Sequence, residues 1–420
     1  MTAASAFSAS QVSSLADLRS ASRWRDPRSS LLLKVLGIGL DDPRFARYKQ
    51  ALWQGDPLAD EVAAWIHANK GGWQLFQQAL EQGVDSLASV PAPFRAFFDH
   101  IERRPHWVDD DLMRRGAHAV LRSGLIGTTA LGSVSLMIGY AADAAVKPLA
   151  MTGNLSGGAK KRLSETSRWT IDCALSETLP RDSEGFRSTV RVRMMHAFIR
   201  GSLAQRPDWR ADDWGAPIQQ LDMMATQLEF STIFMAGCAA QGLVYSHAER
   251  EAIMHYYRYI CWLMGVDEDL QPRTFREGLE AAAIIMATSD MQPDADSAAL
   301  TRGLFGASRD IMAEQQGAEW FKAFMGYRAA ALSRLMLSDR VADRMEVPPA
   351  RSRLPLLAGS ALIFAADRLL GLAPATRAWR DRLGRQMFQQ ALKPENFGFI
   401  PTISGRAVVK DSVAVSGSAA

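Results

Sequence analysis

Apolar residues recur at intervals of three and four along most of the chain, a spacing that collects them on one face of an α-helix. Gly and Pro residues separate most of the segments that show it. No sustained alternation of Val, Ile and Thr with polar residues, the pattern of a strand, occurs in the sequence. The sequence therefore predicts an all-α protein. The predicted helical segments are Leu58–Ala68, Gly72–Gln82, Val108–Arg122, Lys160–Thr178, Arg187–Gln205, Ile218–Gly237, His247–Gly265 and Arg273–Ala287.

The two ends of the chain lack this periodicity. Residues 1–28 are rich in Ser, Ala and Arg and predict a disordered N-terminal arm, whereas residues 29–342 predict one helical domain. Prolines near residue 348 mark a connector into a closing helical hairpin, residues 343–403, that we expect to pack on the main domain. The small side chains of residues 404–420 predict a flexible tail.

Composition and charge narrow the function classes. The 420 residues are 48% hydrophobic and 22% charged, which is ordinary for a globular protein. The 48 Lys and Arg residues are interspersed with 45 Asp and Glu residues, so the basic stripe that nucleic acids require is missing. Three widely spaced cysteines support neither a disulfide framework nor a cysteine metal centre and fit a reducing compartment. With no clear export signal in the sequence, we expect a cytoplasmic protein.

One uncharged stretch is long enough to cross a membrane. Gly124–Ala142 has nineteen residues without a charge, but four of them are Gly and four are Ser or Thr. We therefore expect a buried core segment, a plausible wall for an apolar pocket, and no transmembrane span. Peripheral contact with a membrane stays open, and the oligomeric state is not determined by the sequence.

A cluster of a histidine and two arginines is the first candidate for chemistry. Arg193, His196 and Arg200 stand at i, i+3 and i+7, so they share one side of a helix. Two nearby cations disfavour protonation of the imidazole and preserve the lone pair that a metal ligand needs. Such a cluster suits an iron porphyrin, with the imidazole on the iron and the guanidinium groups on the propionates. The alternative is a core or interface histidine beside ordinary ion pairs, and spacing alone favours that alternative.

A second polar face lies about thirty residues upstream. Arg162, Glu165, Thr166 and Trp169 recur at three- and four-residue steps, and the loop Leu179–Phe186 would let this helix run antiparallel to the one with the histidine. A flat cofactor could lie between the two helices. The alternative is a solvated helix with an Arg162–Glu165 pair.

Other sites of known chemistry are less well supported. His247, Glu251 and His255 follow one another at four-residue spacing, but the two histidines are two turns, ~12 Å, apart and cannot share one ion. The sequence contains no Gly-rich phosphate loop, no Gly-x-Ser-x-Gly elbow and no His-Glu-x-x-His motif. Nucleotide hydrolysis and triad chemistry therefore lack their usual signatures.

Taken in order, several motifs resemble the family that includes bacterial latex-clearing protein and the fungal membrane-bound oxygenase of mycophenolic acid biosynthesis. The resemblance covers roughly residues 90–300, and is weaker in the closing hairpin. Its motifs are Thr152-Gly153, Arg162-Leu163 with Thr166, Arg193-x-x-His196-x-x-x-Arg200, Trp214-Gly-x-Pro-Ile218 and Tyr256-Tyr257.

The resemblance implies a globin-like helical core wrapped by additional helices, and haem b as cofactor. It implies that His196 is the iron ligand and that Arg162 and Thr166 face bound oxygen. Two positions depart from the latex enzymes: Glu165 replaces a distal Lys, and Val146 replaces an upstream carboxylate thought to act as a base. The base could then be Glu165, which shares a face with Arg162, or Asp143.

The resulting hypothesis is an oxidoreductase, a haem b-dependent oxygenase that uses dioxygen on an apolar, unsaturated, isoprenoid-like small molecule. Arg162 and Thr166 would bond the oxygen, and Glu165 would remove an allylic proton. Rubber itself is a doubtful substrate without export. Two alternatives remain: a non-catalytic haem protein, such as a sensor, carrier or peroxidase-like scavenger, and a cofactor-free helical interaction protein.

Overall fold

The computed structural model describes residues 22–25, 30–152, 158–289, 291–314 and 317–391. Within these residues the chain forms helices and a single isolated β-bridge, which confirms the all-α prediction. The α-helices are α1 (Leu31–Leu36), α2 (Pro43–Ala51), α3 (Pro57–Ala68), α4 (Gly72–Gln82), α5 (Ala92–Glu102), α6 (Asp110–Leu121), α7 (Gly124–Ala130), α8 (Leu136–Tyr140), α9 (Asp143–Met151), α10 (Ala159–Leu175), α11 (Glu184–Ala204), α12 (Ala211–Trp214), α13 (Gln220–Phe230), α14 (Thr232–Ala240), α15 (His247–Leu263), α16 (Phe275–Thr288), α17 (Ala295–Glu314), α18 (Glu319–Leu337), α19 (Asp339–Arg344), α20 (Leu354–Leu370) and α21 (Pro374–Ala391).

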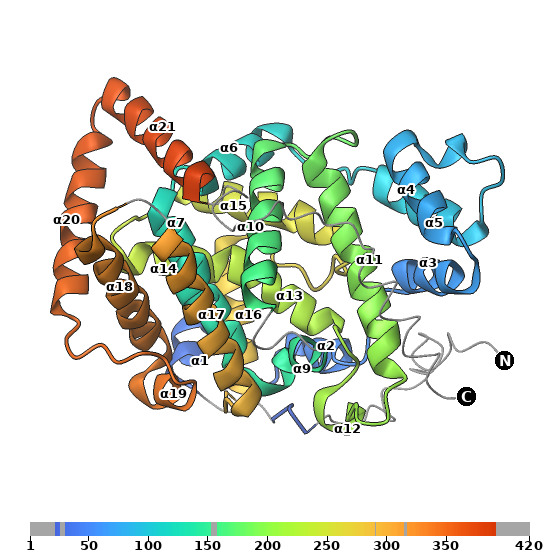
Figure 1. The fold of residues 1–420 in the computed structure, drawn as a ribbon, viewed down its shortest axis with the longest axis horizontal. Coiled ribbons are helices and arrows are strands. Elements are labelled where there is room, and N and C mark those ends of the chain that lie inside the picture. Colours follow the sequence, from blue (N-terminus) through green and yellow to red (C-terminus); the bar gives the residue numbers. More distant parts are fainter. Residues whose placement is uncertain (1–21, 26–29, 153–157, 290, 315–316, 392–420) are drawn as a thin grey trace.

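Helices α10 and α11 cross the middle of the molecule, with α3, α4 and α5 grouped at one end and α18, α19 and α20 at the other (Figure 1). The largest core cluster joins α3–α6 to α10, α11 and α15. Its aromatic centre contains Phe76, Phe94, Phe97 and Phe98, all fully buried, whose rings pack edge-on or tilted. This packing fixes the position of α11 from the side of α3–α5.

The closest helix contact in this core is between α6 and α15. At Gly116 of α6, a Cβ atom would lie 2.6 Å from the Cβ of Tyr256 and 2.9 Å from the backbone of Ala252. Since both neighbours belong to the rigid part of α15, they cannot yield to a larger side chain.

We therefore expect Gly116→Ala to lower the free energy of unfolding by ~1–3 kcal/mol, as overpacked core sites do. Urea denaturation followed by circular dichroism measures this loss. Gly201→Ala is the matched control, because open space surrounds that helical glycine. Equal stability of the two variants would contradict the packing described here.

The predicted segment Ile218–Gly237 is two helices, and its prediction as one helix was wrong. The chain breaks at Ser231 (φ −115°, ψ −86°), between α13 and α14. The Ser231 hydroxyl donates to the carbonyl of Gln227 at 2.7 Å, a local bond that competes with the helical ladder. The break places the last residues of α13 beside α8 and the turn that precedes it.

Part of the predicted N-terminal arm is held against the body. Arg23 donates to both carboxylate oxygens of Asp222 at 2.8 and 2.9 Å, and Trp24 forms the isolated bridge with Ser289. Residues 22–25 therefore differ from the predicted loose arm. Residues 1–21 and the predicted tail, 404–420, lie outside the described residues.

The segment Gly124–Ala142 folds as α7, a π-helical turn (Leu131–Ser135) and α8. Among the described residues, no single helix is long and apolar enough to cross a membrane. The pair formed by α6 and Gly124–Tyr140 has the required length and hydropathy when taken together, but the two parts are bent by 89° relative to each other. The closing hairpin is formed by α20 and α21, and α21 packs on α7 and α6.

Candidate functional site

The candidate site is built on the antiparallel pair α10 and α11. Near the turn that joins them, the indole Nε1 of Trp169 donates to the Thr189 hydroxyl at 3.0 Å. The Sγ of Cys173 lies 3.4 Å from the same hydroxyl. These contacts fix the facing sides of the two helices and confirm that the helices run antiparallel.

The same faces, continued away from the turn, carry the predicted site residues. Arg162 lies seven residues before Trp169, and His196 lies seven residues after Thr189. Seven residues are almost two full helical turns, so each residue returns to the side from which its helix contacts the other. From these contacts we expect Arg162 and His196 to lie at the same level of the pair, and their joint role in a site stays a prediction.

His196 is half-buried and lacks a hydrogen-bond partner at one nitrogen. Its Nδ1 is buried, and no described residue bonds to it. Burial, together with the charge of Arg200, lowers the pKa of the imidazole to about 4. The ring is thus neutral near neutral pH and keeps a lone pair for a metal.

Arg162 has a similar unpaired atom on the opposite helix. One terminal guanidinium nitrogen of Arg162 is buried without a partner among the described residues, and the side chain lies beside the Tyr140 hydroxyl of α8. An unpaired buried donor of this kind is costly in a finished core, so it indicates a place where another group is bound.

The other two predicted residues of α10 are more open. The Glu165 side chain is 30% exposed and lies 3.9 Å from Lys161 Nζ. Burial nevertheless raises the pKa of Glu165 above its ordinary value. Thr166 is exposed, so its role toward bound oxygen stays a prediction.

The two predicted arginines of α11, Arg193 and Arg200, point to the start of α3. Arg193 donates to both oxygens of Asp56 at 2.7 and 2.9 Å, and its guanidinium lies over the Phe97 ring. Burial pushes the pKa of Asp56 up, but the charge and hydrogen bonds of Arg193 outweigh it and hold that pKa below its usual value. Arg200 pairs with Asp60 at 2.9 Å. Contact of either arginine with haem propionates stays a prediction, and these ion pairs are the partners that the alternative interpretation expected.

Neither Val146 nor Asp143 offers a free carboxylate at the position of the missing base. Val146 is 2% exposed and packs in an apolar cluster with Met137, Tyr140 and Leu300. Asp143 begins α9, where burial and the charge of Asp294 raise its pKa while Lys147 lowers it. Asp143 therefore belongs to the charged group around Lys147.

Sequence reasoning missed a further carboxylate in this region, Glu229. It is the next-to-last residue of α13, and an added Cβ at Gly139 of α8 would lie 3.0 Å from its carboxylate carbon. The Ser135 hydroxyl, in the π-helical turn, donates to the Glu229 carbonyl at 2.6 Å. Burial and the charge of Asp222 raise the pKa of Glu229 to about 8. Neither the helix break at Ser231 nor the π-helical turn changes the spacing of apolar residues, so neither can be predicted from that spacing. A π-helical turn is a feature frequent at functional sites.

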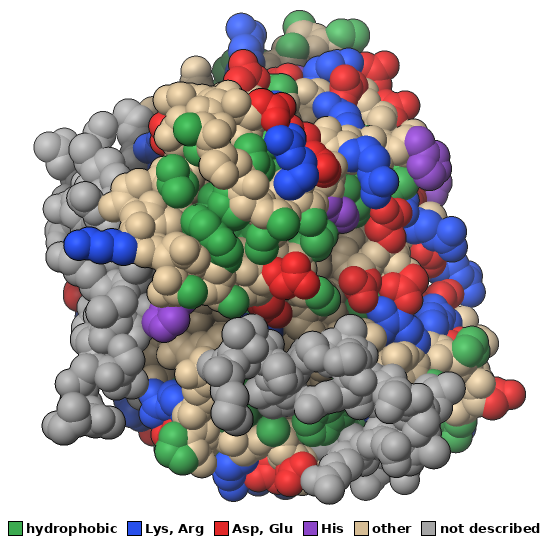
Figure 2. Space-filling view, turned by 90° about the vertical axis from the view of Figure 1, so that its right-hand side faces the viewer, with side chains coloured by type: hydrophobic (Ala, Val, Ile, Leu, Met, Phe, Trp, Pro, Cys, Tyr) green, Lys and Arg blue, Asp and Glu red, His purple; other side chains and the backbone are tan. Residues whose placement is uncertain are grey.

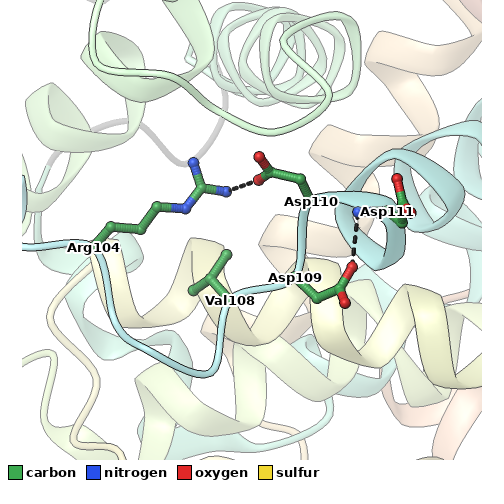
Figure 3. A pocket seen from close by; sticks show the side chains of 5 residues that line it. All are labelled: Arg104, Val108, Asp109, Asp110 and Asp111. Carbon is green, nitrogen blue, oxygen red and sulfur yellow. Dashed lines mark hydrogen bonds and ion pairs between the residues drawn. The ribbon is translucent and has the colours of Figure 1, made fainter.

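Surface pockets away from α10 and α11 are lined by side chains that form ordinary polar pairs. Figure 3 shows one before α6, where Arg104 pairs with Asp110 and the Asp109 carboxylate accepts the amide of Asp111 at 2.8 Å. On the face that includes α3–α5, Lys and Arg side chains are mixed with Asp and Glu (Figure 2). These features carry no strong single-sign field.

The candidate histidines of α15 have separate environments. His255 accepts the amide of Asp109 at 3.0 Å, whereas His247 lies 3.8 Å from Glu251. No group of three or more metal-ligating side chains occurs in the described part of the chain. A haem needs one protein ligand, and the unpaired Nδ1 of His196 together with the unpaired guanidinium of Arg162 fits such a group.

Comparisons with known proteins identify a family and a fold for this chain. The family model described as "ER-bound oxygenase mpaB/B'/Rubber oxygenase, catalytic domain" matches residues 121–366. The rubber oxygenase of Streptomyces sp. (strain K30) is 28% identical over 250 residues, which are 57% of this chain and 58% of that relative. The structure of latex clearing protein LCP in the closed state is similar in fold, with a TM-score of 0.59, 24% identity, and coverage of 84% of this chain and 92% of that chain.

Proposed function

Because this chain belongs to the family of the mpaB and rubber oxygenase catalytic domains, we propose that it is a haem b-dependent oxygenase. Its substrate would be an apolar, unsaturated, isoprenoid-like small molecule, and dioxygen would be the second substrate. The observation that carries this proposal is the pair of buried nitrogens, on His196 and Arg162, that lack partners on facing helices.

His196 would hold the haem iron, and the lowered pKa of its ring keeps it in the neutral form that binds metal. Haem, when bound, supplies the iron chemistry that activates dioxygen. Arg162 contributes a fixed positive charge and a free N–H opposite His196, where it can hydrogen-bond oxygen as negative charge develops. Glu165 and Thr166 stay the predicted base and second hydrogen-bond donor.

The substrate side of the site is apolar. In the π-helical turn, Gly132 has open space where a side chain would stand, and the neighbouring Leu131, Leu136 and Ile138 are partly buried. This wall suits an unsaturated hydrocarbon, whose binding depends on burial of apolar surface.

Arg162→Ala is expected to lower kcat for oxygen consumption with an isoprenoid substrate by ~10²–10³-fold, the usual loss of one charge-stabilising donor. The haem absorption should remain, because His196 is unchanged. Arg114→Ala, at an exposed arginine of α6, is the matched control and should keep the wild-type rate. A wild-type rate in Arg162→Ala would contradict the proposed role of Arg162 as a hydrogen-bond donor to oxygen.

The second candidate function is a haem protein that binds oxygen without turnover. Burial of Val146 in an apolar cluster, where the latex enzymes carry a carboxylate, favours it. Reduction without oxygen, followed by oxygen and isoprenoid candidates, separates the two functions. A stable oxygen-bound form with no product in any mixture would select the second function, and a colourless folded protein from haem-supplied cells would reject both.

A further inference from the structure

The Glu229 side chain is partly buried near the candidate site, and no cation among the described residues acts on its pKa. It rests against the bare backbone of Gly139, where any larger residue would collide with it. The next residue, Phe230, packs edge-on against Trp169 of α10 at 5.3 Å between ring centroids. Glu229 is therefore held where α13, α8 and α10 converge.

Two titratable groups interact with it. Asp222, two turns earlier on α13, raises the pKa of Glu229. Tyr140 from α8 is influenced by both Glu229 and Arg162 of α10, which act on its pKa in opposite directions. The surroundings of Tyr140 thus include both the proposed oxygen-binding arginine and the Glu229 carboxylate.

Resting on the proposed function, we propose that Glu229 is the proton acceptor of the oxygenation, in the place of the carboxylate that Val146 replaces. A Glu229 carboxylate oxygen takes a proton from an allylic carbon. The C–H electron pair forms a new C=C bond, and the original π pair forms a C–O bond to dioxygen. Glu229 then returns the proton to the terminal oxygen, so the product is a hydroperoxide and Glu229 is regenerated.

Glu229 suits this role better than the two carboxylates considered first. Glu165 lies beside Lys161, and Asp143 lies in the charged group of Lys147 and Asp294. No cation acts on the pKa of Glu229, which is raised to about 8, near the pH at which the protein would work, as an efficient proton-transfer group requires. Because the ionised form is the acceptor, kcat should rise with pH through about 8.

The test uses Glu229→Gln, which keeps the shape of the side chain and removes its titration. We expect a haem spectrum like the wild type, a loss of kcat of ~10²-fold or more with little change in KM, and no rise of kcat with pH. The infrared band of a protonated carboxylic acid, which the wild type should lose as pH passes about 8, should be missing from the variant even without haem.

Gly139→Ala is a second variant, which should displace the Glu229 carboxylate, shift that infrared titration and lower kcat. Glu81→Gln, on the exposed face of α4, is the matched control. Wild-type kcat and pH dependence in Glu229→Gln would overturn the proposal while leaving the oxygenase function intact. A wild-type protein without haem or product would instead overturn the proposed function, and this inference with it.

An independent observation concerns the outer face of α20. Leu354, Leu357, Leu362, Leu369 and the following Leu372 form a stripe at helical spacing, and each is 49–78% exposed. Within α20, whose residues are all described, Leu356 alone is buried. A stripe of this length exceeds the scattered apolar residues that are normal on a surface.

The charge around this stripe is strongly positive. Residues 351–391 contain seven Arg and two Asp and no Lys or Glu, whereas the whole chain has a net charge of only +3. Apolar side chains flanked by arginines are the combination that holds a helix in the plane of a membrane with anionic lipids. We propose that α20 docks on an anionic bilayer surface, from which an apolar substrate could be drawn.

Sedimentation of the full chain with vesicles tests this proposal. We expect binding to phosphatidylcholine vesicles that contain phosphatidylserine, much weaker binding to phosphatidylcholine alone, and at least a tenfold loss in the double variant Leu362→Glu/Leu369→Glu. Leu31→Glu, at an exposed leucine of α1, is the matched control. Absence of vesicle binding, equal binding by both variants, or a dimer in light scattering that the double variant dissociates would each overturn it.

Discussion

His196→Ala is expected to abolish the Soret band of the protein purified from haem-supplied cells. The imidazole is the proposed protein ligand of the iron, and alanine offers no atom that could replace it. The variant should stay folded, because the Nδ1 of His196 forms no hydrogen bond with the described residues, and the substitution therefore breaks none there. Absorption spectra at matched protein concentration measure the haem content.

His247→Ala is the matched control, since that imidazole is 81% exposed and lies far along the sequence on α15. It should retain the complete haem spectrum. Full haem content in His196→Ala would show that another residue binds the iron, and the whole functional assignment would then fail.

Arg193→Met is expected to cause the largest loss of stability, ~3–5 kcal/mol, because it leaves the Asp56 carboxylate buried without its partner. The two side chains are only 2% and 4% exposed, and water cannot replace the lost guanidinium. Urea denaturation at neutral pH measures the loss. Arg114→Ala, which removes a surface pair with Asp111, should leave the free energy of unfolding nearly unchanged.

The double variant Arg193→Met/Asp56→Leu separates the two interpretations of Arg193. If Arg193 serves only the ion pair, the double variant should regain much of the stability and bind haem normally. A double variant that is stable and still loses haem would support the predicted contact with a propionate. A single variant as stable as Arg114→Ala would contradict the buried pair.

The helices and their order could be predicted because apolar periodicity reports burial directly. Gly72–Gln82 is α4 residue for residue, and most other segments begin and end within a few residues of the predicted positions. The break at Ser231 escaped prediction, because apolar periodicity continues through it and the competing bond of the Ser231 hydroxyl leaves no mark in that pattern. Anchoring of residues 22–25 also depends on a distant partner, Asp222, which local composition does not report.

Residues of the candidate site that share one helix could be predicted from their spacing. Contacts between residues of different helices could not. Spacing predicted Arg162 and His196 on neighbouring helices, and these are the antiparallel pair α10 and α11. It could not show that Arg193 and Arg200 meet carboxylates of α3, because those partners lie more than a hundred residues away. Glu229 is recognisable only from the convergence of α13 and α8 at Gly139.

The contact between Trp169 and Thr189 holds α10 and α11 together near the connection between them, where Glu177 and Leu179 adopt left-handed conformations (φ 49° and 50°). Arg162 and His196 lie farther along the same two helices. A substitution at Trp169 or Thr189 that changes side-chain volume should therefore alter the spacing of the two helices at the proposed site without replacing a residue of that site.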